Sequence, residues 1–283
     1  MARIAILTPS PADEAFGGRW RDVFERNAEP LLRAGFAVED RAWTDAQDLC
    51  EFDLVLPLLV WGYHRDGADW IDAVGRWERE GVRVRNPAEV LRWNAEKSYL
   101  GRLAQRGAPA VPTRYVSRVD ERVLAEAAEA FGTDRVVAKP LASSTAWRTI
   151  RWPGDPAADG PEGAAMVQPY LPRIERDGEV SLIYFGGHYS HAIRKVPQPG
   201  DFRVQPEFDG IISRHEPAAD ERAAAAAILA AVEEELLYAR IDLVRGLEGE
   251  PQLIELELIE PDLYLGYDPA GGAAFAEAVR EAA

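Results

Sequence analysis

The first 85 residues alternate between hydrophobic patterns typical of buried strands and patterns typical of amphipathic helices. Short apolar or alternating runs predict strands at 4–7, 37–43, 54–61 and 82–85. Helical spacing of apolar residues predicts helices at 20–34 and 69–80. Because strands that alternate with helices usually pair in parallel, this part of the chain is predicted to form a small parallel α/β unit.

Asn86-Pro87 interrupts this pattern and marks the start of a second module. Asn86 is suited to cap a helix and Pro87 to occupy its first position, and the helix is expected to run to Asn94. The following residues predict helices at 97–105 and 120–131 and strands at 113–116, 135–140, 147–152 and 166–171. The last of these strands leads out of the second module.

The remaining residues predict two hairpins joined by a long helix. Gly186-Gly187 separates the strand-like runs 179–185 and 188–196 and is typical of a tight hairpin turn. An Ala- and Glu-rich run predicts a helix at 220–238, strands follow at 239–244 and 252–258, and a short helix is expected at 270–283. The fold class predicted is therefore α/β (α+β).

The last hairpin carries the strongest chemical signal. If Glu248-Gly249 is a two-residue turn, Asp242 lies opposite Glu255 and Arg240 lies opposite Glu257 on one face, and the other face is apolar. Two carboxylates about 5 Å apart repel by about 3 kcal/mol at an effective dielectric constant of about 20. A bound cation would remove that cost. Alternatively, Arg240 neutralises Glu257 and the face is an ordinary solvated surface; the pattern alone leaves both interpretations open.

Composition excludes several classes of partner. The chain has 32 basic and 48 acidic residues and a net charge of -16, which argues against a nucleic-acid or anionic-membrane partner. A single cysteine, Cys50, permits no internal disulfide, so a reducing, cytoplasmic compartment is expected. No uninterrupted run of about 18 apolar residues predicts a membrane span, and the first residues are interpreted as a strand rather than a signal peptide.

Common catalytic motifs are absent from the sequence. It contains no G-x-x-x-x-G-K-[ST], no G-x-G-x-x-G and no H-E-x-x-H motif, and its four histidines lack metal-ligand spacing. Ser190 and His191 are neighbours in a predicted strand, so their side chains are expected to point to opposite faces and not to pair as nucleophile and base. We therefore expect no serine hydrolase.

What the sequence does contain is a set of cations spread along the chain and three acids on its last strands. These residues are Lys97, Lys139, Lys195 and Arg203, with Asp242, Glu255 and Glu257. Lysines that contact phosphates and carboxylates that hold Mg²⁺ are the groups needed to handle a nucleoside triphosphate without a P-loop. Taken singly, each residue could instead be an ordinary surface charge.

The order of these residues resembles the ATP-grasp superfamily, and within it the glutathione-synthetase-like branch. Seven segments in the family's order carry the resemblance: 94–97, 137–140, 167–171 with 177–179, 191–197, 200–203, 240–242 and 255–261. The last segments, with 181–185 and 190–192, look like the subgroup that contains the cyclo-ligase closing O-ureidoserine to cycloserine. The resemblance implies an ATP-grasp fold with an N-terminal α/β domain (1–86), a central lid lobe (87–167) and a C-terminal lobe with the metal site (168–283).

The resemblance also implies roles for individual side chains. Lys97 and Lys139 would grip the nucleotide phosphates from the two lobes, and Lys195 would lie beside the nucleotide. The loop after Lys139 usually carries glycines, whose backbone amides close over the phosphates. Here Ser143 and Ser144 stand in that loop, and their hydroxyl groups could donate instead.

Further groups complete the implied site. The strand between the lobes would bind adenine through its backbone; its residues are Gln168, Pro169, Tyr170 and Leu171. Glu179, with Asp177 as the alternative, would hold the ribose. Arg203 would face the γ-phosphate and the reacting carboxylate.

The acidic hairpin becomes a metal site under the same resemblance. Asp242, Glu255 and Glu257 would bind one or two Mg²⁺ ions, with Mn²⁺ as an alternative, and Arg240 would brace these acids. Many relatives have an asparagine where this chain has Glu257, so the site is expected to be more acidic than theirs.

The implied function is an ATP-dependent carboxylate-amine ligase, which forms a C–N bond through an acylphosphate and releases ADP and phosphate. Its partners would be a small amino-acid-like carboxylate and an amine, with a homodimer as an open alternative. Loops 10–18 and 61–64, at the C-terminal ends of the first strands, would line the substrate pocket. An intramolecular cyclo-ligase and a catalytically silent ATP-binding module remain the alternatives.

Overall fold

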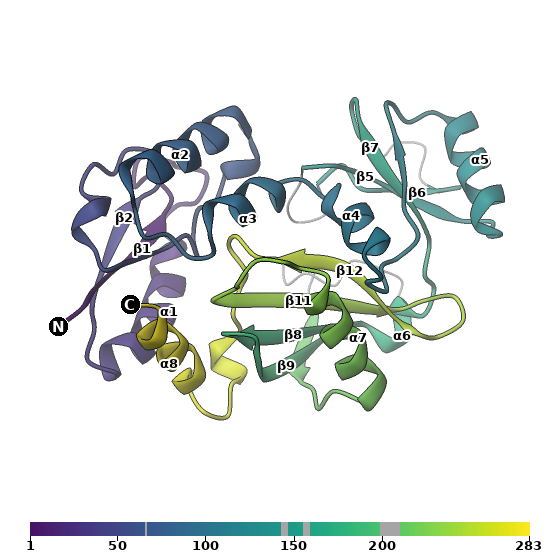
Figure 1. Ribbon diagram of the computed structural model, residues 1–283. Helices are drawn as coiled ribbons and strands as arrows, with labels where there is room; N and C mark the ends of the chain where they lie inside the picture. The colour runs from purple at the N-terminus through teal and green to yellow at the C-terminus, as the bar shows by residue number, and fades with distance from the viewer. Residues whose placement is uncertain (66, 143–146, 155–158, 199–209) are drawn as a thin grey trace.

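The computed structural model describes residues 1–65, 67–142, 147–154, 159–198 and 210–283. Helices and strands form a mixed α/β structure with one parallel and two antiparallel sheets (Figure 1). The predicted fold class is confirmed by this arrangement. Ser143, Ser144 and Arg203, which carry predicted roles, lie outside the described residues.

The N-terminal unit is a three-stranded parallel sheet in the order β2-β1-β3. Its elements are β1 (Arg3–Thr8), α1 (Trp20–Arg33), β2 (Ala37–Ala42), η1 (Leu49–Glu51), β3 (Leu54–Leu56), η2 (Tyr63–Arg65) and α2 (Gly67–Glu80). Side chains of the central strand β1 alternate between two cores: Ile4 packs in the core with α1, whereas Ala5 packs in the core with Trp70 of α2. Because both faces are covered, β1 is a continuous apolar run.

Two predicted strands of this unit are shorter than expected. The predicted strand 54–61 ends at Leu56, because Pro57 has no N–H group to continue the ladder. The predicted strand 82–85 is reduced to one bridge between Val55 and Val84.

The middle of the chain forms a four-stranded antiparallel sheet in the order β4-β7-β5-β6. Its elements are α3 (Ala88–Trp93), α4 (Tyr99–Gln105), β4 (Arg114–Val116), α5 (Glu121–Phe131), β5 (Val136–Pro140), β6 (Ile150–Trp152) and β7 (Ala165–Pro169). Helix α5 covers the sheet through a small core that includes Leu124 and Val136. Asp120 caps α5 by accepting a hydrogen bond from the Val123 amide (2.9 Å), and Gly132 ends the helix in a left-handed conformation.

The C-terminal part forms a five-stranded antiparallel sheet in the order β10-β9-β8-β11-β12. Its elements are α6 (Ile174–Asp177), β8 (Glu179–Phe185), β9 (His188–Val196), β10 (Ile211–Arg214), α7 (Ala219–Ala230), β11 (Tyr238–Arg245), β12 (Pro251–Glu257), η4 (Leu265–Tyr267) and α8 (Ala273–Ala282). Helices α4 and α7 pack on one face of this sheet, in a core shared with Leu182, Ile241 and Leu256. The opposite face carries the charged residues of the site.

The predicted helix 220–238 is too long. Helix α7 ends at Ala230, and Tyr238 already belongs to β11. Three consecutive glutamates, 233–235, follow the helix, and negative charge at a helix C-terminus opposes the helix dipole. The Trp93 indole donates a hydrogen bond to one of them, Glu234 (2.8 Å), so this segment is held outside the helix.

Asn86 does not cap the following helix, as the sequence predicted. Pro87 occupies the position before α3, and the fully buried Asn86 side chain instead bonds to the C-terminal sheet. Its amide donates to the carbonyls of Tyr238 (2.9 Å) and Leu258 (2.8 Å) and accepts from the Leu237 amide (2.8 Å). Asn86 therefore ties the end of the first unit to β11 and β12.

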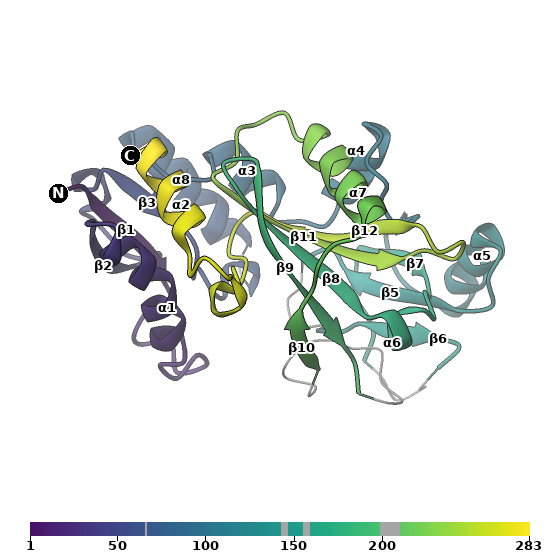
Figure 2. The same ribbon diagram turned by 90° about the horizontal axis from the view of Figure 1, so that it is seen from below.

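The C-terminal helix α8 returns to the first unit, where it lies beside α1 (Figure 2). Helix α4 packs in a core made mostly by the C-terminal sheet, to which Met166 of the central sheet also contributes. The division into 1–86, 87–167 and 168–283 remains a proposal.

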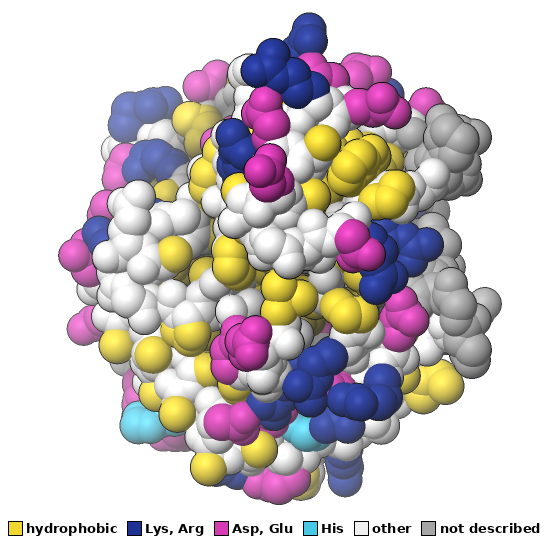
Figure 3. Space-filling view, turned by 90° about the vertical axis from the view of Figure 1, so that its right-hand side faces the viewer, with side chains coloured by type: hydrophobic (Ala, Val, Ile, Leu, Met, Phe, Trp, Pro, Cys, Tyr) yellow, Lys and Arg dark blue, Asp and Glu magenta, His cyan; other side chains and the backbone are white. Residues whose placement is uncertain are grey.

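Acidic and basic side chains are mixed on the face shown in Figure 3. In the described part of that face, several basic side chains gather at the lower right and acidic groups lie around them. Within the described residues, every helix is too short or too polar to cross a membrane.

Candidate functional site

The pairing predicted for the acidic hairpin is present. Asp242 lies opposite Glu255, and Arg240 lies opposite Glu257. The predicted turn, however, is wrong: the loop has three residues, 247–249, closed by a hydrogen bond from the Gly246 amide to the Glu250 carbonyl (2.8 Å).

A β-bulge at Ile254 compensates for the longer turn. Leu243 pairs with Leu253 and Asp242 pairs with Glu255, so Ile254 is the extra residue of β12. Strict alternation would place Leu253 on the same face as Glu255. Because of the bulge, Leu253 instead enters the buried core with Leu256. Ile254 lines the cavity beside the hairpin.

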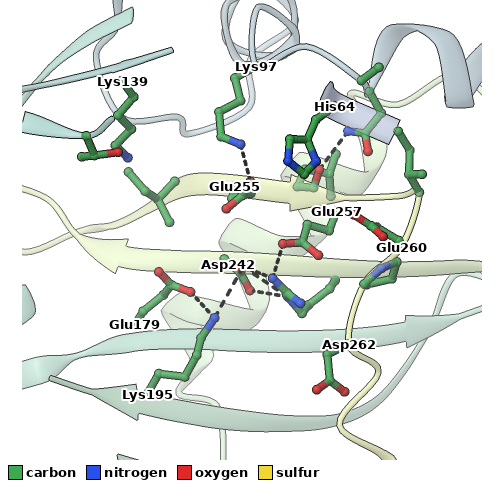
Figure 4. Close-up of a pocket in the computed structure, with 18 of the residues that line it drawn as sticks. His64, Lys97, Lys139, Glu179, Lys195, Asp242, Glu255, Glu257, Glu260 and Asp262 are labelled. Atoms are coloured by element: carbon green, nitrogen blue, oxygen red, sulfur yellow. Dashed lines mark hydrogen bonds and ion pairs between the residues drawn. The ribbon is translucent and has the colours of Figure 1, made fainter. Parts of the chain in front are cut away.

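The cavity lies over one face of the C-terminal sheet, and side chains of alternating charge run across this face (Figure 4). Glu179 pairs with Lys195, whose Nζ lies 3.6 Å from Asp242 Oδ2. Arg240 Nη2 lies 2.9 Å from the same Asp242 oxygen and also pairs with Glu257. The predicted bracing role of Arg240 therefore agrees with its contacts.

Two more contacts hold the carboxylates. The Ser181 hydroxyl donates to Asp242 Oδ1 at 2.5 Å. Lys97, just before α4, places its Nζ 2.7 Å from Glu255 Oε1. We call Asp242, Glu255 and Glu257 the acidic floor.

The pKa values show that this floor is short of positive charge at one end. Burial alone would raise the pKa of Asp242, but Arg240 and Lys195 outweigh it and lower that pKa to about 2. Burial raises the pKa of Glu257 to about 7, against the lowering effect of Arg240 and with the neighbouring Glu255 and Asp242 adding to the rise. A cation bound beside Glu257 would stabilise its ionised form.

The acidic floor has the donor set of a hard metal ion. Each of its three residues offers a carboxylate oxygen, and these atoms lie within 4.8 Å of one another. Oxygen ligands from carboxylates are those that Mg²⁺ prefers. The residues present therefore fit such an ion.

A cavity of about 550 Å³ lies over the acidic floor, between the central and C-terminal sheets. Most of the predicted nucleotide-site residues line it: Lys97, Lys139, Gln168, Pro169, Tyr170, Leu171, Glu179 and Lys195. Lys139 projects from β5, and burial lowers the pKa of its amine, partly offset by Glu255. Gln168 is buried and its amide donates to the Thr113 hydroxyl (2.9 Å).

The N-terminal unit closes the other end of the cavity. Of the predicted substrate loops, 61–64 lines it, and Phe16 is the contribution of loop 10–18. Figure 4 shows His64 at this end, across the acidic floor from Lys139 and Glu179.

Not every predicted residue reaches the cavity. Asp177, the alternative ribose ligand, pairs with Arg176 (2.7 Å) and Arg173 (3.0 Å) and is not among the described residues that line the cavity. Glu179 does line it. Of the two candidates, Glu179 is therefore the residue that is in a position to hold the ribose.

The argument against a Ser190–His191 pair is also wrong. Ser190 Oγ lies 2.9 Å from His191 Nδ1, although the two are neighbours in β9. His191 Nε2 bonds to the Leu263 carbonyl (3.0 Å), so this nitrogen carries the proton and Nδ1 accepts from the hydroxyl. Neither side chain is among the described residues lining the cavity.

Tyr264 and Glu260 are among the cavity residues that received no role from the sequence. Tyr264 has a left-handed backbone (φ 47°), and its ring lies 5.9 Å from the Lys195 ammonium and 5.7 Å from the Arg240 guanidinium. Glu260 lines the cavity three residues after Glu257. Glu260 could have been noticed in the sequence because it follows Glu255 and Glu257 as a third closely spaced acid. The backbone conformation of Tyr264 could not be predicted from the sequence.

Comparison with known proteins agrees with this geometry. Residues 4–86 match the family model of the N-terminal domain of the D-cycloserine synthetase DcsG. Over 280 residues the chain is 32% identical to the cycloserine biosynthesis protein DcsG of Streptomyces lavendulae, covering 89% of this chain and 92% of that protein. It is 27% identical over 201 residues to a glutathione synthetase of Ralstonia nicotianae, covering 64% of this chain and 57% of that protein.

Solved structures give the same fold. The crystal structure of the D-cycloserine synthetase DcsG matches with a TM-score of 0.81 and 27% identity, over 99% of both chains. The ATP-grasp ligase PsnB, in a complex with Mg and ADP, matches with a TM-score of 0.65 and 16% identity, over 99% of this chain and 98% of that one. At this identity the second match shows the fold alone, which is the ATP-grasp fold.

Proposed function

Since the chain belongs to the DcsG family of ATP-grasp ligases, we propose that it activates the carboxylate of a small amino-acid derivative with ATP and closes it onto a nitrogen of the same molecule. Family membership makes the chain an ATP-dependent C–N ligase. Ring closure, the residues that perform it and the metal ion are the proposal.

The nucleotide is proposed to lie at the end of the cavity formed by the two antiparallel sheets. Lys139 and Lys97 would contact its phosphates from either side, and the backbone of 168–171 would bind adenine. Glu179 would hold the ribose, and Lys195 would lie beside the nucleotide. Ser143, Ser144 and Arg203, outside the described residues, keep their proposed roles at the phosphates and the reacting carboxylate.

The acidic floor is proposed to hold Mg²⁺, with Mn²⁺ as an alternative. The ion would neutralise the phosphate oxygens during transfer. Support comes from the three convergent carboxylates and from the pKa of Glu257, which burial raises to about 7. Arg240 and Ser181 orient Asp242 within this floor.

The proposed reaction has two steps. A substrate carboxylate oxygen bonds to the γ-phosphorus of ATP while the bond to the bridging oxygen breaks, which gives an acylphosphate and ADP. The substrate nitrogen then bonds to the acyl carbon, phosphate leaves and the nitrogen loses a proton. The protein's part is to position the groups, stabilise the developing charge and exclude water, which would hydrolyse the acylphosphate.

One observation carries ring closure over ligation of two molecules. The region that matches the DcsG N-terminal domain, residues 4–86, supplies the wall at the substrate end, including Trp61, Tyr63 and His64. The residues that select the substrate therefore belong to the part matched to a cycloserine-forming synthetase. Ligation of two molecules, which the sequence analysis favoured, is the second candidate, and the match to glutathione synthetase supports it.

A product screen tests the proposal. The protein is incubated with ATP, Mg²⁺ and single amino-acid derivatives, beginning with O-ureidoserine, and ADP release and product masses are measured. Ring closure predicts ADP release with one substrate and a first product lighter than it by one water. ADP release that requires two different reactants, with a product containing both, would replace ring closure by intermolecular ligation.

A further inference from the structure

Glu260 is an acid at the substrate end of the cavity without a visible partner. It lines the cavity, and its Oε2 atom is buried without a hydrogen-bond partner in the described part of the chain. Figure 4 shows Glu260 on the same side of the acidic floor as His64, opposite Lys139 and Glu179. Nothing in the proposed reaction uses this residue.

The surroundings of Glu260 would be stabilised by a positive charge. Burial raises its pKa well above the usual value, and the neighbouring Glu257 raises it further against the lowering effect of Arg240. Arg240 is already engaged by Asp242 and Glu257. An acid with a buried oxygen that has no hydrogen-bond partner is costly to ionise, so a ligand that brings a cation would be favoured at this position.

The chemistry of the wall favours an organic cation over a second metal ion. Trp61 and Tyr63 line the same end, and Glu260 lies near enough to Tyr63 to add to the effect of burial in raising the pKa of that phenol. Aromatic rings beside a carboxylate bind ammonium groups well, whereas a divalent ion needs several oxygen ligands. Among the described residues, the only cluster with metal-ligand geometry is the acidic floor, which does not include Glu260.

We propose that Glu260 binds the protonated α-amine of the amino-acid substrate. This assignment rests on the proposed function, because it takes the substrate to be an amino-acid derivative activated at its carboxylate. Holding the α-amine as an ammonium also keeps it from acting as a nucleophile, since an ammonium nitrogen has no free electron pair. The other nitrogen of the substrate is then the one available for attack.

The test compares two ligands on two proteins. The variant Glu260→Gln keeps the shape of the side chain and removes its charge, and Glu248→Gln, on the exposed hairpin loop, is the matched control. The ligands are O-ureidoserine and its analogue with hydrogen in place of the α-amino group. Binding is measured by calorimetry with ADP and Mg²⁺ present, so the readout does not require ring closure.

The expected result is a loss of selectivity. The wild-type protein and Glu248→Gln should bind the amino compound about 10–100-fold more tightly than its deamino analogue, and this ratio should fall close to one in Glu260→Gln. Binding of the deamino analogue and of ATP should stay unchanged, which also shows that the variant is folded. Should Glu260→Gln not fold, Glu260→Asp is the second variant, and a reduced but retained preference is expected.

Two outcomes would overturn the assignment. An unchanged ratio in Glu260→Gln would show that Glu260 does not contact the amine. A weaker Mg²⁺ affinity with the same ratio would make Glu260 a metal ligand instead. If the wild-type protein releases ADP only with two reactants, ring closure fails, yet the comparison of the two ligands still decides the role of Glu260.

Discussion

Lys97 and Glu255 form an ion pair, with 2.7 Å between Nζ and Oε1, that joins the segment before α4 to the acidic floor. A proposed phosphate-binding lysine is thus held beside a proposed metal ligand. Burial would raise the pKa of Glu255, but Lys97 outweighs it and keeps that pKa below its usual range. Glu255 is therefore ready to bind a cation at neutral pH.

Removing the charge of Glu255 should abolish turnover. In Glu255→Gln the acidic floor loses one of its three carboxylates, so ADP release should fall by more than about 100-fold, and its dependence on Mg²⁺ concentration should weaken. The measurement is a coupled ADP assay over a series of Mg²⁺ concentrations, with Glu248→Gln as the exposed control. Full activity in Glu255→Gln would contradict the assignment of Glu255 as a metal ligand.

Because of Lys139, ATP binding should become weaker at alkaline pH. Since burial lowers its pKa below the ordinary 10.5, the amine loses its proton at a lower pH than an exposed lysine would. The KM for ATP should therefore rise with pH from that lowered pKa upward, and the rise should be absent in Lys139→Arg, whose guanidinium stays charged. Lys139→Ala should weaken ATP binding by about tenfold or more at neutral pH.

The same pKa shift has a consequence for stability. The folded state disfavours the charged amine, so in the window between the lowered and the ordinary pKa the unfolded chain binds more protons. Through Lys139 the free energy of unfolding should rise with pH in this window. Urea titrations of the wild-type protein and Lys139→Met over a series of pH values measure this dependence. If the wild-type free energy of unfolding falls with pH relative to that of Lys139→Met, the prediction is contradicted.

The acidic hairpin shows how far sequence can predict this site. The facing of Asp242 and Glu255 was predictable because charged and apolar residues alternate in both strands. The three-residue turn and the bulge at Ile254 were not predictable, because the bulge depends on burying Leu253 and Leu256 together. The prediction of register is confirmed because these two single-residue offsets cancel.

Other parts of the prediction failed for reasons of tertiary structure. Asn86 is a residue type that often caps helices, but four backbone groups, from Leu237, Tyr238 and Leu258, bond to its side chain instead. The sequence placed Arg240 opposite Glu257, but it did not indicate the contact of Arg240 with Asp242 or the carboxylates that Lys195 reaches. Side-chain partners across a sheet depend on rotamers and on neighbouring strands, which a linear pattern does not contain.

Asn94 should affect metal binding although it is not part of the acidic floor. Strand β12 is the edge of its sheet, and the buried Asn94 amide replaces a strand neighbour: it donates to the Leu256 carbonyl (2.8 Å) and accepts from the Leu258 amide (2.9 Å). These two bonds flank Glu257. Asn94→Ala should cost about 2–4 kcal/mol of unfolding free energy and weaken Mg²⁺ affinity by about tenfold.

The control for Asn94 is Asn86→Ala. Asn86 also binds buried backbone groups, but of the two neighbours of Glu257 it bonds only to Leu258, whereas Asn94 bonds to both Leu256 and Leu258. Its loss of stability in urea titration should be similar, with a smaller change in Mg²⁺ affinity measured by calorimetry. Equal changes in Mg²⁺ affinity would mean that both residues act through overall stability alone.

The Ser190–His191 pair should be dispensable as a nucleophile and base. The Ser190 hydroxyl donates to a neutral His191, whose pKa is lowered by burial, but the described cavity lining includes neither residue. Ser190→Ala should keep ADP release within about twofold of the wild type. His191→Ala should reduce it more, because His191 holds the Leu263 carbonyl next to Tyr264, whose ring lies against Lys195 and Arg240 in the cavity. Loss of turnover in Ser190→Ala, together with labelling of Ser190 by a fluorophosphonate, would instead make this serine a nucleophile.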